Sequence, residues 1–312
     1  MARRYWMQTL TIPRNVRPAA GTSAKGRHLR RTAQIGVAAI AAPAAGVAAT
    51  LAFTRLSFER QLAREVEDLF AAGSPADPPA LTEAALAGLP EPVQRWLRNS
   101  GVVGQKRPTT VRLRYGGEFR LGEDKGWLPY VSQTYYTTNP PAFVWTVEMR
   151  MFGLVPVVGR DQYRNGEGSI RMKVLSLVPV ADKAGGGLNQ GDLLRYLGET
   201  IWFPAGAVAP YIRWEPRDAD SAVATMTYGG VTASLTFVFD AEGRVIRQEA
   251  ADRYNDARGR PEPWSVPITG HGQFDGVRVP TEGTGVWNYA TGDYTYIHWR
   301  VSDVQYDHPE RY

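Results

Sequence analysis

The sequence predicts a mainly β fold of the α+β class, in which an antiparallel meander forms an open half-barrel and one helix packs in its concave face. Three observations support this prediction. Apolar and polar residues alternate with a period of two from Thr109 to the C-terminus. Turn-forming pairs separate these runs, and one strongly apolar helical segment interrupts them. Strands that bury one face are typical of antiparallel sheets, so a βαβ nucleotide-binding sheet is not expected.

The alternation is clearest in residues 111–115, 143–151 and 297–301. A further strand is expected near residues 172–180, before the helical segment. Turn residues between the strand-like runs predict hairpins at Gly116-Gly117, Asn165-Gly166, Gly229-Gly230, Asp240 to Gly243, Asp275-Gly276 and Gly292-Asp293. Together these signals predict about ten to eleven strands, joined mostly by hairpins.

The N-terminal region differs from the rest of the chain in charge. Residues 1–31 carry eight basic side chains and no acid, which predicts a basic cytoplasmic tail. Residues 32–54 are uncharged and close to the roughly 20 residues that cross a bilayer, so they predict a transmembrane helix or uncleaved signal anchor. This single pass through the cytoplasmic membrane would place the N-terminus inside and the C-terminal domain outside. A cleaved signal peptide is the alternative, because the segment is rich in Ala and contains Pro43.

Residues 55–88 are expected to form an amphipathic helix and a linker. Phe58, Leu62, Val66 and Leu69 recur at helical spacing among charged residues. The Gly, Ser and clustered Pro that follow are typical of a linker.

Residues 89–312 form the predicted exported β-rich domain, which opens with a short helix over residues 91–99. Pro92 suits the first helical turn, and Gly101 ends the helix. Trp96 on its apolar edge is interpreted as a core anchor against the sheet.

A second helix is predicted from Asp192, which can cap its N-terminus, to about Trp202. Apolar side chains cover most of its circumference, so we expect it in the interior, against the concave face of the sheet. Arg195 and Glu199 lie four residues apart on its polar side and can form an ion pair.

Composition and motifs exclude several classes of function. The chain has no Cys, which excludes disulfides, thiolate nucleophiles and Cys-ligated metals. It has no P-loop, G-x-S-x-G or H-E-x-x-H motif, so neither a cofactor nor a metal is predicted. The tail contributes +8 to the net charge of +5, which leaves −3 for the rest, and no nucleic-acid partner is expected. His271 and His298 are interpreted as hydrogen-bonded rim residues.

Three glycines give the one signal that loosely resembles a cofactor motif. Gly185, Gly187 and Gly191 precede or open the second helix, as in a dinucleotide-binding turn. Their spacing departs from G-x-G-x-x-G, and no parallel strand follows. A hairpin end explains these glycines equally well.

The favoured hypothesis is a cavity for an apolar or lipid-like ligand between the helix and the concave sheet face. Inward-facing rows of Trp, Phe and Met exceed what a one-sided sheet needs unless something covers them. The candidate cavity residues are Trp145, Met149, Tyr163, Met172, Leu194, Trp202 and Tyr254, and the polar candidates are Asp161, Arg195 and Glu199. No catalytic residue is predicted, and protein partners stay open.

Two other classes of function remain. A cell-envelope hydrolase would use a pair of carboxylates among Glu148, Asp161, Glu199 and Asp252. A structural or interaction module would have a filled core and no cavity.

Several motifs occur together in this chain, among them LPEPVQRWLRNSGVVG, GRDQYRNGEG, GDLLRYLGETIWFP and DGVRVPTEGTGVWNY. As a set they resemble a bacterial family of unknown function over residues 89–307. More distantly, the strand-rich pattern with an internal helix resembles the periplasmic lipoprotein carriers and lipid-binding proteins of the LolA/LppX kind. That second resemblance implies an open β-barrel around an apolar cavity and no catalytic residue.

Overall fold

The computed structural model describes residues 24–73 and 78–312. Helix α1 (Ala24–Ala72) passes through two compact units, Met1–Thr50 and Leu51–Tyr312. Most of the predicted basic tail lies outside the described residues. Across the described residues, no helix combines the length and the apolar character that a membrane crossing requires.

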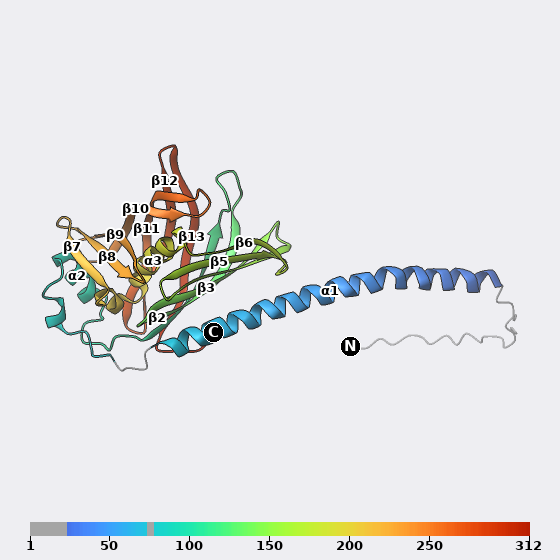
Figure 1. The fold of residues 1–312 in the computed structure, drawn as a ribbon, viewed down its shortest axis with the longest axis horizontal. Helices are drawn as coiled ribbons and strands as arrows, with labels where there is room; N and C mark the ends of the chain where they lie inside the picture. Colours follow the sequence, from blue (N-terminus) through green and yellow to red (C-terminus); the bar gives the residue numbers. More distant parts are fainter. Residues whose placement is uncertain (1–23, 74–77) are drawn as a thin grey trace, which may run out of the picture. The chain divides into compact units, whose positions relative to one another are not determined.

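The second unit is built on one antiparallel sheet of thirteen strands (Figure 1). The strands are β1 (Thr110–Phe119), β2 (Leu128–Thr138), β3 (Pro141–Met151), β4 (Val155–Arg164), β5 (Glu167–Val174), β6 (Val178–Ala184), β7 (Ile212–Pro216), β8 (Ser221–Tyr228), β9 (Val231–Phe239), β10 (Val245–Asn255), β11 (Arg260–Phe274), β12 (Val277–Tyr289) and β13 (Gly292–Tyr306). The helices of this unit, besides residues 51–72 of α1, are α2 (Glu91–Asn99), α3 (Gly187–Glu199) and the 3-10 helices Glu83–Leu86, Thr200–Trp202 and Pro204–Val208.

The sheet order explains how one helix comes to lie inside the curve of the sheet. Strands β1 to β6 form one meander and β7 to β13 form a second, and the two meanders join where β1 pairs with β13. β6 and β7 are therefore the two outer edges. The chain between them forms α3, which packs against β5, β9 and β10 (Figure 1). The curled half-barrel with a packed helix is the architecture that the sequence predicted.

Most predicted turns join consecutive strands. Asn165-Gly166, Gly229-Gly230 and Asp275-Gly276 lie at the β4–β5, β8–β9 and β11–β12 turns. Asp240 to Gly243 likewise join β9 to β10.

Other strand boundaries were predicted wrongly. Gly116-Gly117 lies within β1, where a Cβ on either residue would collide with the backbone of a neighbouring strand, so these glycines serve close packing instead of a turn. Gly292 begins β13, after the turn. The single strand expected near residues 172–180 is two strands, β5 and β6.

Helix α2 has the predicted bounds and anchors the core. Pro92 stands in its first turn, where a missing N–H costs nothing. Trp96 is buried and contacts the rings of Trp214 and Phe237, at 6.1 and 5.8 Å between centroids. The interpretation of Trp96 as a core anchor is confirmed.

Helix α3 begins five residues earlier than predicted, so Asp192 is not its cap. The chain enters the helix through Gly186, and Asp192 lies one turn inside with its side chain buried. A positive φ of 60° at Gly186 allows this entry, which only a residue without Cβ adopts easily. Two further short helical turns, Thr200–Trp202 and Pro204–Val208, complete the segment.

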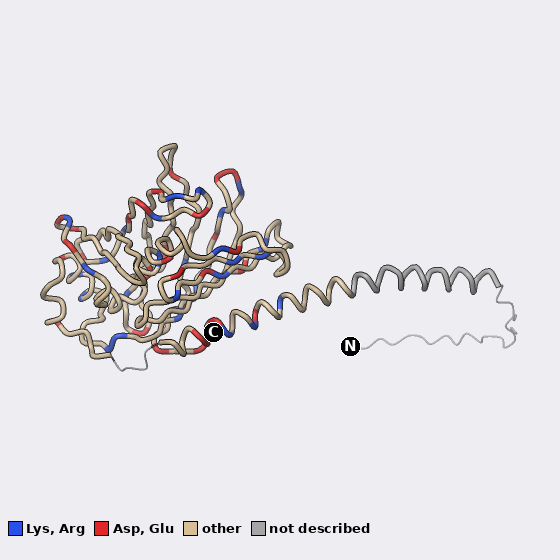
Figure 2. Tube along the Cα trace, viewed as in Figure 1, with Lys and Arg blue, Asp and Glu red and all other residues tan. Residues whose placement is uncertain are grey.

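Residues 51–72 of α1 pack on the convex face of the sheet. Val66 and Leu69 form a cluster with Tyr135 and Val144, which explains why β3 is apolar on both faces near its start. Figure 2 shows Lys and Arg intermixed with Asp and Glu over the described part of this unit. Among these charges, Glu65 of α1 forms an ion pair of 2.9 Å with the buried Arg160 of β4.

Candidate ligand-binding cavity

A cavity of about 210 Å³ lies between the concave face of the sheet and the segment formed by α3 and Thr200–Trp202. Strands from both meanders contribute to its wall, which is mainly apolar and aromatic. The lining residues are Tyr115, Phe119, Trp145, Met149, Asp161, Ile170, Met172, Arg195, Gly198, Glu199, Ile201, Trp202, Gln248, Arg253, Trp264, Val266, Gly285, Tyr296, Ile297 and Trp299.

Three aromatic rings form one side of this cavity. Trp202 lies 5.7 Å from Tyr115 and 5.6 Å from Trp299, measured between ring centroids. Trp299 pairs across the sheet with Gly117 on one side and Gly283 on the other. A Cβ at Gly283 would collide with the Trp299 ring, so the glycine lets this ring lie close to the sheet and leaves room above it.

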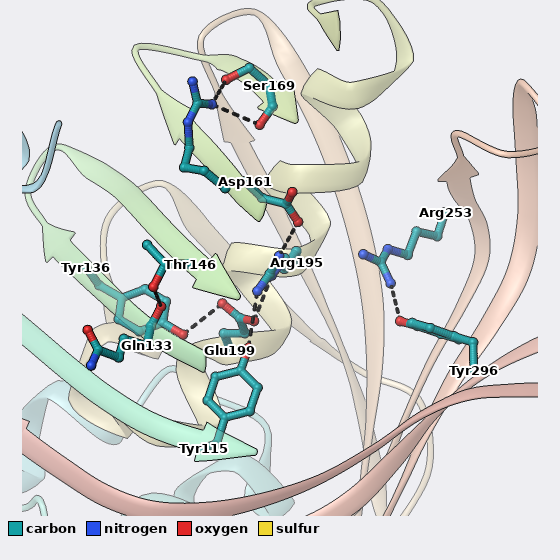
Figure 3. Close-up of polar contacts among 11 residues, drawn as sticks. Tyr115, Gln133, Tyr136, Thr146, Asp161, Ser169, Arg195, Glu199, Arg253 and Tyr296 are labelled. Atoms are coloured by element: carbon teal, nitrogen blue, oxygen red, sulfur yellow. Dashed lines mark hydrogen bonds and ion pairs between the residues drawn. The ribbon is translucent and has the colours of Figure 1, made fainter. Parts of the chain in front are cut away.

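The polar part of the cavity centres on Arg195 (Figure 3). Its Nη1 donates to Asp161 Oδ2 and its Nε to Glu199 Oε1, both at 2.8 Å. Its Nη2 contacts the Tyr115 hydroxyl at 3.3 Å, and the Tyr136 hydroxyl donates to Glu199 Oε2 at 2.8 Å. One guanidinium therefore holds two carboxylates and joins α3 to β4.

Burial shapes the protonation of this cluster. It raises the pKa of Asp161 above its ordinary value, while the nearby Arg195 opposes that shift. It raises the pKa of Asp192 well above its ordinary value, and the negative charge of Asp161 adds to the effect. Burial also raises the pKa of the Tyr115 hydroxyl to about 12.

Arg253 of β10 brings a second guanidinium to the wall (Figure 3). Its Nη1 donates to the Tyr296 hydroxyl at 3.2 Å, and its guanidinium lies 4.4 Å from the Trp264 ring centre. Within the described residues, Arg253 Nε, Asp161 Oδ1 and Trp145 Nε1 are buried without a hydrogen-bond partner. Polar groups that can still donate or accept a hydrogen bond therefore belong to residues of the cavity wall.

Most of the predicted cavity residues line this space. They are Trp145, Met149, Met172 and Trp202, together with the polar candidates Asp161, Arg195 and Glu199. Tyr163 and Leu194 are instead fully buried in the core, where Tyr163 stacks on Phe143 at 6.4 Å. Tyr254 lies beside the start of α3, and its ring occupies the space where a Cβ of Gly187 would stand.

Of the four carboxylates considered for hydrolysis, the structure brings two together and places the other two elsewhere. Glu148 lies on the convex side, bound to Arg55 of α1 at 2.6 Å. Asp252 is exposed on β10. Asp161 and Glu199 share the cavity, but Arg195 binds both.

Sequence reasoning missed several cavity residues, including Arg253, Trp264, Tyr296 and Trp299. Tyr296 and Trp299 are three residues apart, so strict alternation would place them on opposite faces of the strand. The pairing of β12 with β13 changes register at Gly285/Val286, and simple alternation therefore does not assign their faces. The Gly283 and Gly285 pair in the partner strand was the available signal, since strand glycines mark close approach.

The remaining candidate groups do not gather into a second site. His271 Nε2 is hydrogen-bonded to the carbonyl oxygen of Val245 at 3.0 Å. The exposed His298 packs against the Trp127 ring. Within residues 24–73 and 78–312, no group of three His, Cys, Asp or Glu side chains is placed to hold a metal ion. A hollow of about 1100 Å³ lies on the convex face, but it is open and lined by ion pairs such as Arg300–Glu282.

Comparison with solved structures gives distant similarities. A DUF1329 family protein from Desulfovibrio piger is 12% identical with a TM-score of 0.38, over 70% of this chain and 92% of that chain. A LolA superfamily protein from Nitrosomonas europaea is 12% identical with a TM-score of 0.38, over 69% of this chain and 93% of that chain. A domain described as an outer membrane lipoprotein-sorting protein, from Vibrio parahaemolyticus, is 9% identical with a TM-score of 0.39, over 69% of this chain and 92% of that chain. A LolA superfamily protein and a lipoprotein-sorting domain are thus among the solved structures to which this chain is similar.

No curated protein matches the chain. A family model does match, over residues 79–299, which is most of the β domain. The predicted resemblance to a family of unknown function is thus confirmed, and the chain belongs to that family, DUF6544.

Proposed function

We propose that this domain binds an apolar or lipid-like ligand in the cavity between α3 and the concave sheet face. The supporting observation is a cavity of about 210 Å³ lined by Trp145, Met149, Met172, Trp202 and further aromatic side chains. Ligand pockets are typically lined in this way, with a few polar groups that fix orientation.

The size of the cavity favours a slender ligand. Pockets for drug-sized molecules span roughly 300–1,000 Å³, and a cavity of about 150 Å³ accommodates a benzene ring. A cavity of about 210 Å³ therefore suits one chain or one ring system of an amphipathic molecule.

The polar groups favour a ligand with one polar end. Asp161 Oδ1 can accept a hydrogen bond, and Arg253 Nε and Trp145 Nε1 can donate one. A buried polar atom without a partner costs free energy, so a ligand group that satisfies these atoms gains affinity. We expect the polar end of the ligand near Asp161 and Arg253, and its apolar part against Trp202 and Trp299.

The location that we propose is the cell envelope. The uncharged residues 32–54 and the basic residues before them support an anchor in the cytoplasmic membrane, with the β domain outside. A cleaved signal peptide would export the same domain without the anchor.

Native mass spectrometry with lipid extraction, on the full chain purified from a membrane-containing host, tests the proposed ligand. We expect a reproducible co-purified lipid. Met172→Trp adds bulk to the cavity wall and should abolish it, whereas Ile246→Trp on the exposed surface should retain it. Circular dichroism checks that both variants fold.

The absence of a bound ligand would contradict this proposal. A protein mass without ligand, together with no uptake of an added apolar fluorophore, would remove the ligand-binding proposal. The domain would then be better explained as a structural or interaction module.

A further inference from the structure

Two neighbouring hairpins of the sheet end in exposed apolar side chains. Phe152 and Leu154, at the β3–β4 turn, are 85% and 83% exposed. Leu177, Val178 and Val180, at and after the β5–β6 turn, are exposed as well. The N–H of Leu175 in the second turn donates to the carbonyl of Pro156 at 2.8 Å, so the two tips lie side by side.

The two tips share one sequence pattern. Residues 149–158 read MRMFGLVPVV and residues 172–181 read MKVLSLVPVA. Met, a basic residue, two apolar residues, a small residue and then Leu-Val-Pro-Val stand at matching positions. Each segment carries one positive charge, at Arg150 or Lys173, and neither contains an acid.

Both turns have an unusual backbone conformation for the residues that occupy them. Phe152 has φ 53° and Leu175 has φ 54°. The residues that follow them, Gly153 and Ser176, also have positive φ angles. Turns with two positive φ values favour Asn and Gly, and bulky residues adopt that region at a cost. The turns at Asn165-Gly166 and Gly229-Gly230 follow the usual preference. Apolar residues therefore occupy a strained turn position where burial in the core does not offset the cost, and such outliers often mark function.

The tips adjoin the point where α1 enters the domain. Leu51 and Arg55 of α1 border one hollow together with Leu154 and Leu175. Phe53 and Leu56, in the same stretch of helix, are also exposed. Leu51 to Thr54 are the last residues of the uncharged segment 32–54, so that segment is covalently joined to the chain beside the tips.

We propose that these two tips, at Phe152–Leu154 and Leu175–Val180, insert into the surface of a lipid bilayer that carries anionic headgroups. The exposed apolar side chains would enter the boundary between headgroups and acyl chains, and Arg150 and Lys173 would face the headgroups. Two observations favour a membrane over a protein partner. Residues 149–158 and 172–181 each carry one cation and no acid, while the adjacent Glu148 is paired with Arg55, and the tips adjoin the end of the uncharged segment. This surface is separate from the cavity and does not depend on the ligand proposed above.

The chain contains no Cys, so single labels can be placed by substitution. Phe152→Cys and Leu177→Cys would each carry an environment-sensitive fluorophore, and Glu242→Cys, in the turn between β9 and β10, is the control. The labelled full chain is reconstituted in vesicles of phosphatidylcholine with phosphatidylglycerol, with and without lipids brominated in their acyl chains. We expect bromine to quench the labels at positions 152 and 177 at least about twofold more than the label at position 242, because only the tips reach the acyl chains.

Three outcomes would overturn the proposal. In the first, all three labels are quenched equally or the chain does not float with the vesicles. In the second, the labels at positions 152 and 177 are blue-shifted but bromine does not quench them, which means that protein covers the tips. In the third, Arg150→Glu with Lys173→Glu leaves the quenching in anionic vesicles unchanged, which would contradict the headgroup contact. Lipid retention in the cavity is measured separately on the same samples.

Discussion

Arg195 of α3 and Asp161 of β4 form an ion pair of 2.8 Å inside the cavity, and the same guanidinium binds Glu199 one helical turn further along. All three side chains are at least 85% shielded from solvent. The position of α3, and with it one wall of the cavity, therefore depends on a buried charge cluster as well as on apolar packing.

Arg195→Met should destabilise the protein strongly. It leaves Asp161 and Glu199 buried without their cation, and breaking a buried pair from one side costs roughly 3–5 kcal/mol. Urea unfolding measures the loss. Arg98→Met removes an ion pair with Glu83 that is exposed on both sides, and it should cost far less stability than Arg195→Met. Equal losses in the two variants would show that the cluster does not stabilise the fold.

Asp192 should make stability depend on pH. Burial raises the pKa of its carboxyl in the folded state, so the folded protein binds this proton more tightly than the unfolded chain. The contribution of Asp192 is therefore fully present below about pH 4, the ordinary range of an Asp, and is lost as the pH rises through the raised pKa. Asp192→Asn keeps the shape of the side chain and removes this titration.

Thermal unfolding from about pH 5 to about pH 8 measures the effect, since this range lies above the ordinary pKa of Asp. The wild-type protein should lose more stability across this range than Asp192→Asn. Asp252→Asn, at an exposed carboxylate, is the control and should follow the wild type. Parallel curves for all three proteins would exclude Asp192 as the responsible group.

Local signals in the sequence predicted much of this fold. Pro92 and Gly101 delimit α2 correctly, and Asn165-Gly166 marks a hairpin, because each of these residues acts on the backbone next to it. The apolar circumference of α3 predicted its place inside the sheet for a similar reason, since a helix without a polar face must be buried.

Long-range packing limited the rest of the prediction. Gly117 and Gly283 look like turn or bulge residues in the sequence, yet they flank Trp299 on adjacent strands. The register that brings them together is set by the pairing of β13 with β1 and with β12, and β1 and β13 lie at opposite ends of the domain's sequence. Arg253 was missed for the same reason, because only the folded sheet brings it near Asp161 and Asp192.

Gly283→Ala tests the close packing beneath Trp299. The new methyl group would collide with the Trp299 ring and lie 2.6 Å from the carbonyl oxygen of Pro267. Overpacking of this kind costs typically about 1–3 kcal/mol, and displacement of the ring should change the tryptophan fluorescence. Gly126→Ala, which meets nothing within 4 Å, should change neither stability nor fluorescence. A Gly283→Ala protein as stable as the wild type would show that the ring moves freely.

Glu65→Gln should loosen α1 from the convex face. Arg160 is buried under the helix, and Glu65 is the carboxylate that pairs with it, at 2.9 Å. The amide keeps the shape of the side chain but leaves the guanidinium charge buried and without its anion, which is strongly destabilising. Limited proteolysis should therefore cleave residues 51–72 faster in Glu65→Gln than in the wild-type protein, while the sheet stays intact. Glu67→Gln, on the exposed side of the same helix, should be cleaved at the wild-type rate. If both variants are cleaved equally, then the apolar contacts of Val66 and Leu69 hold the helix without help from the ion pair.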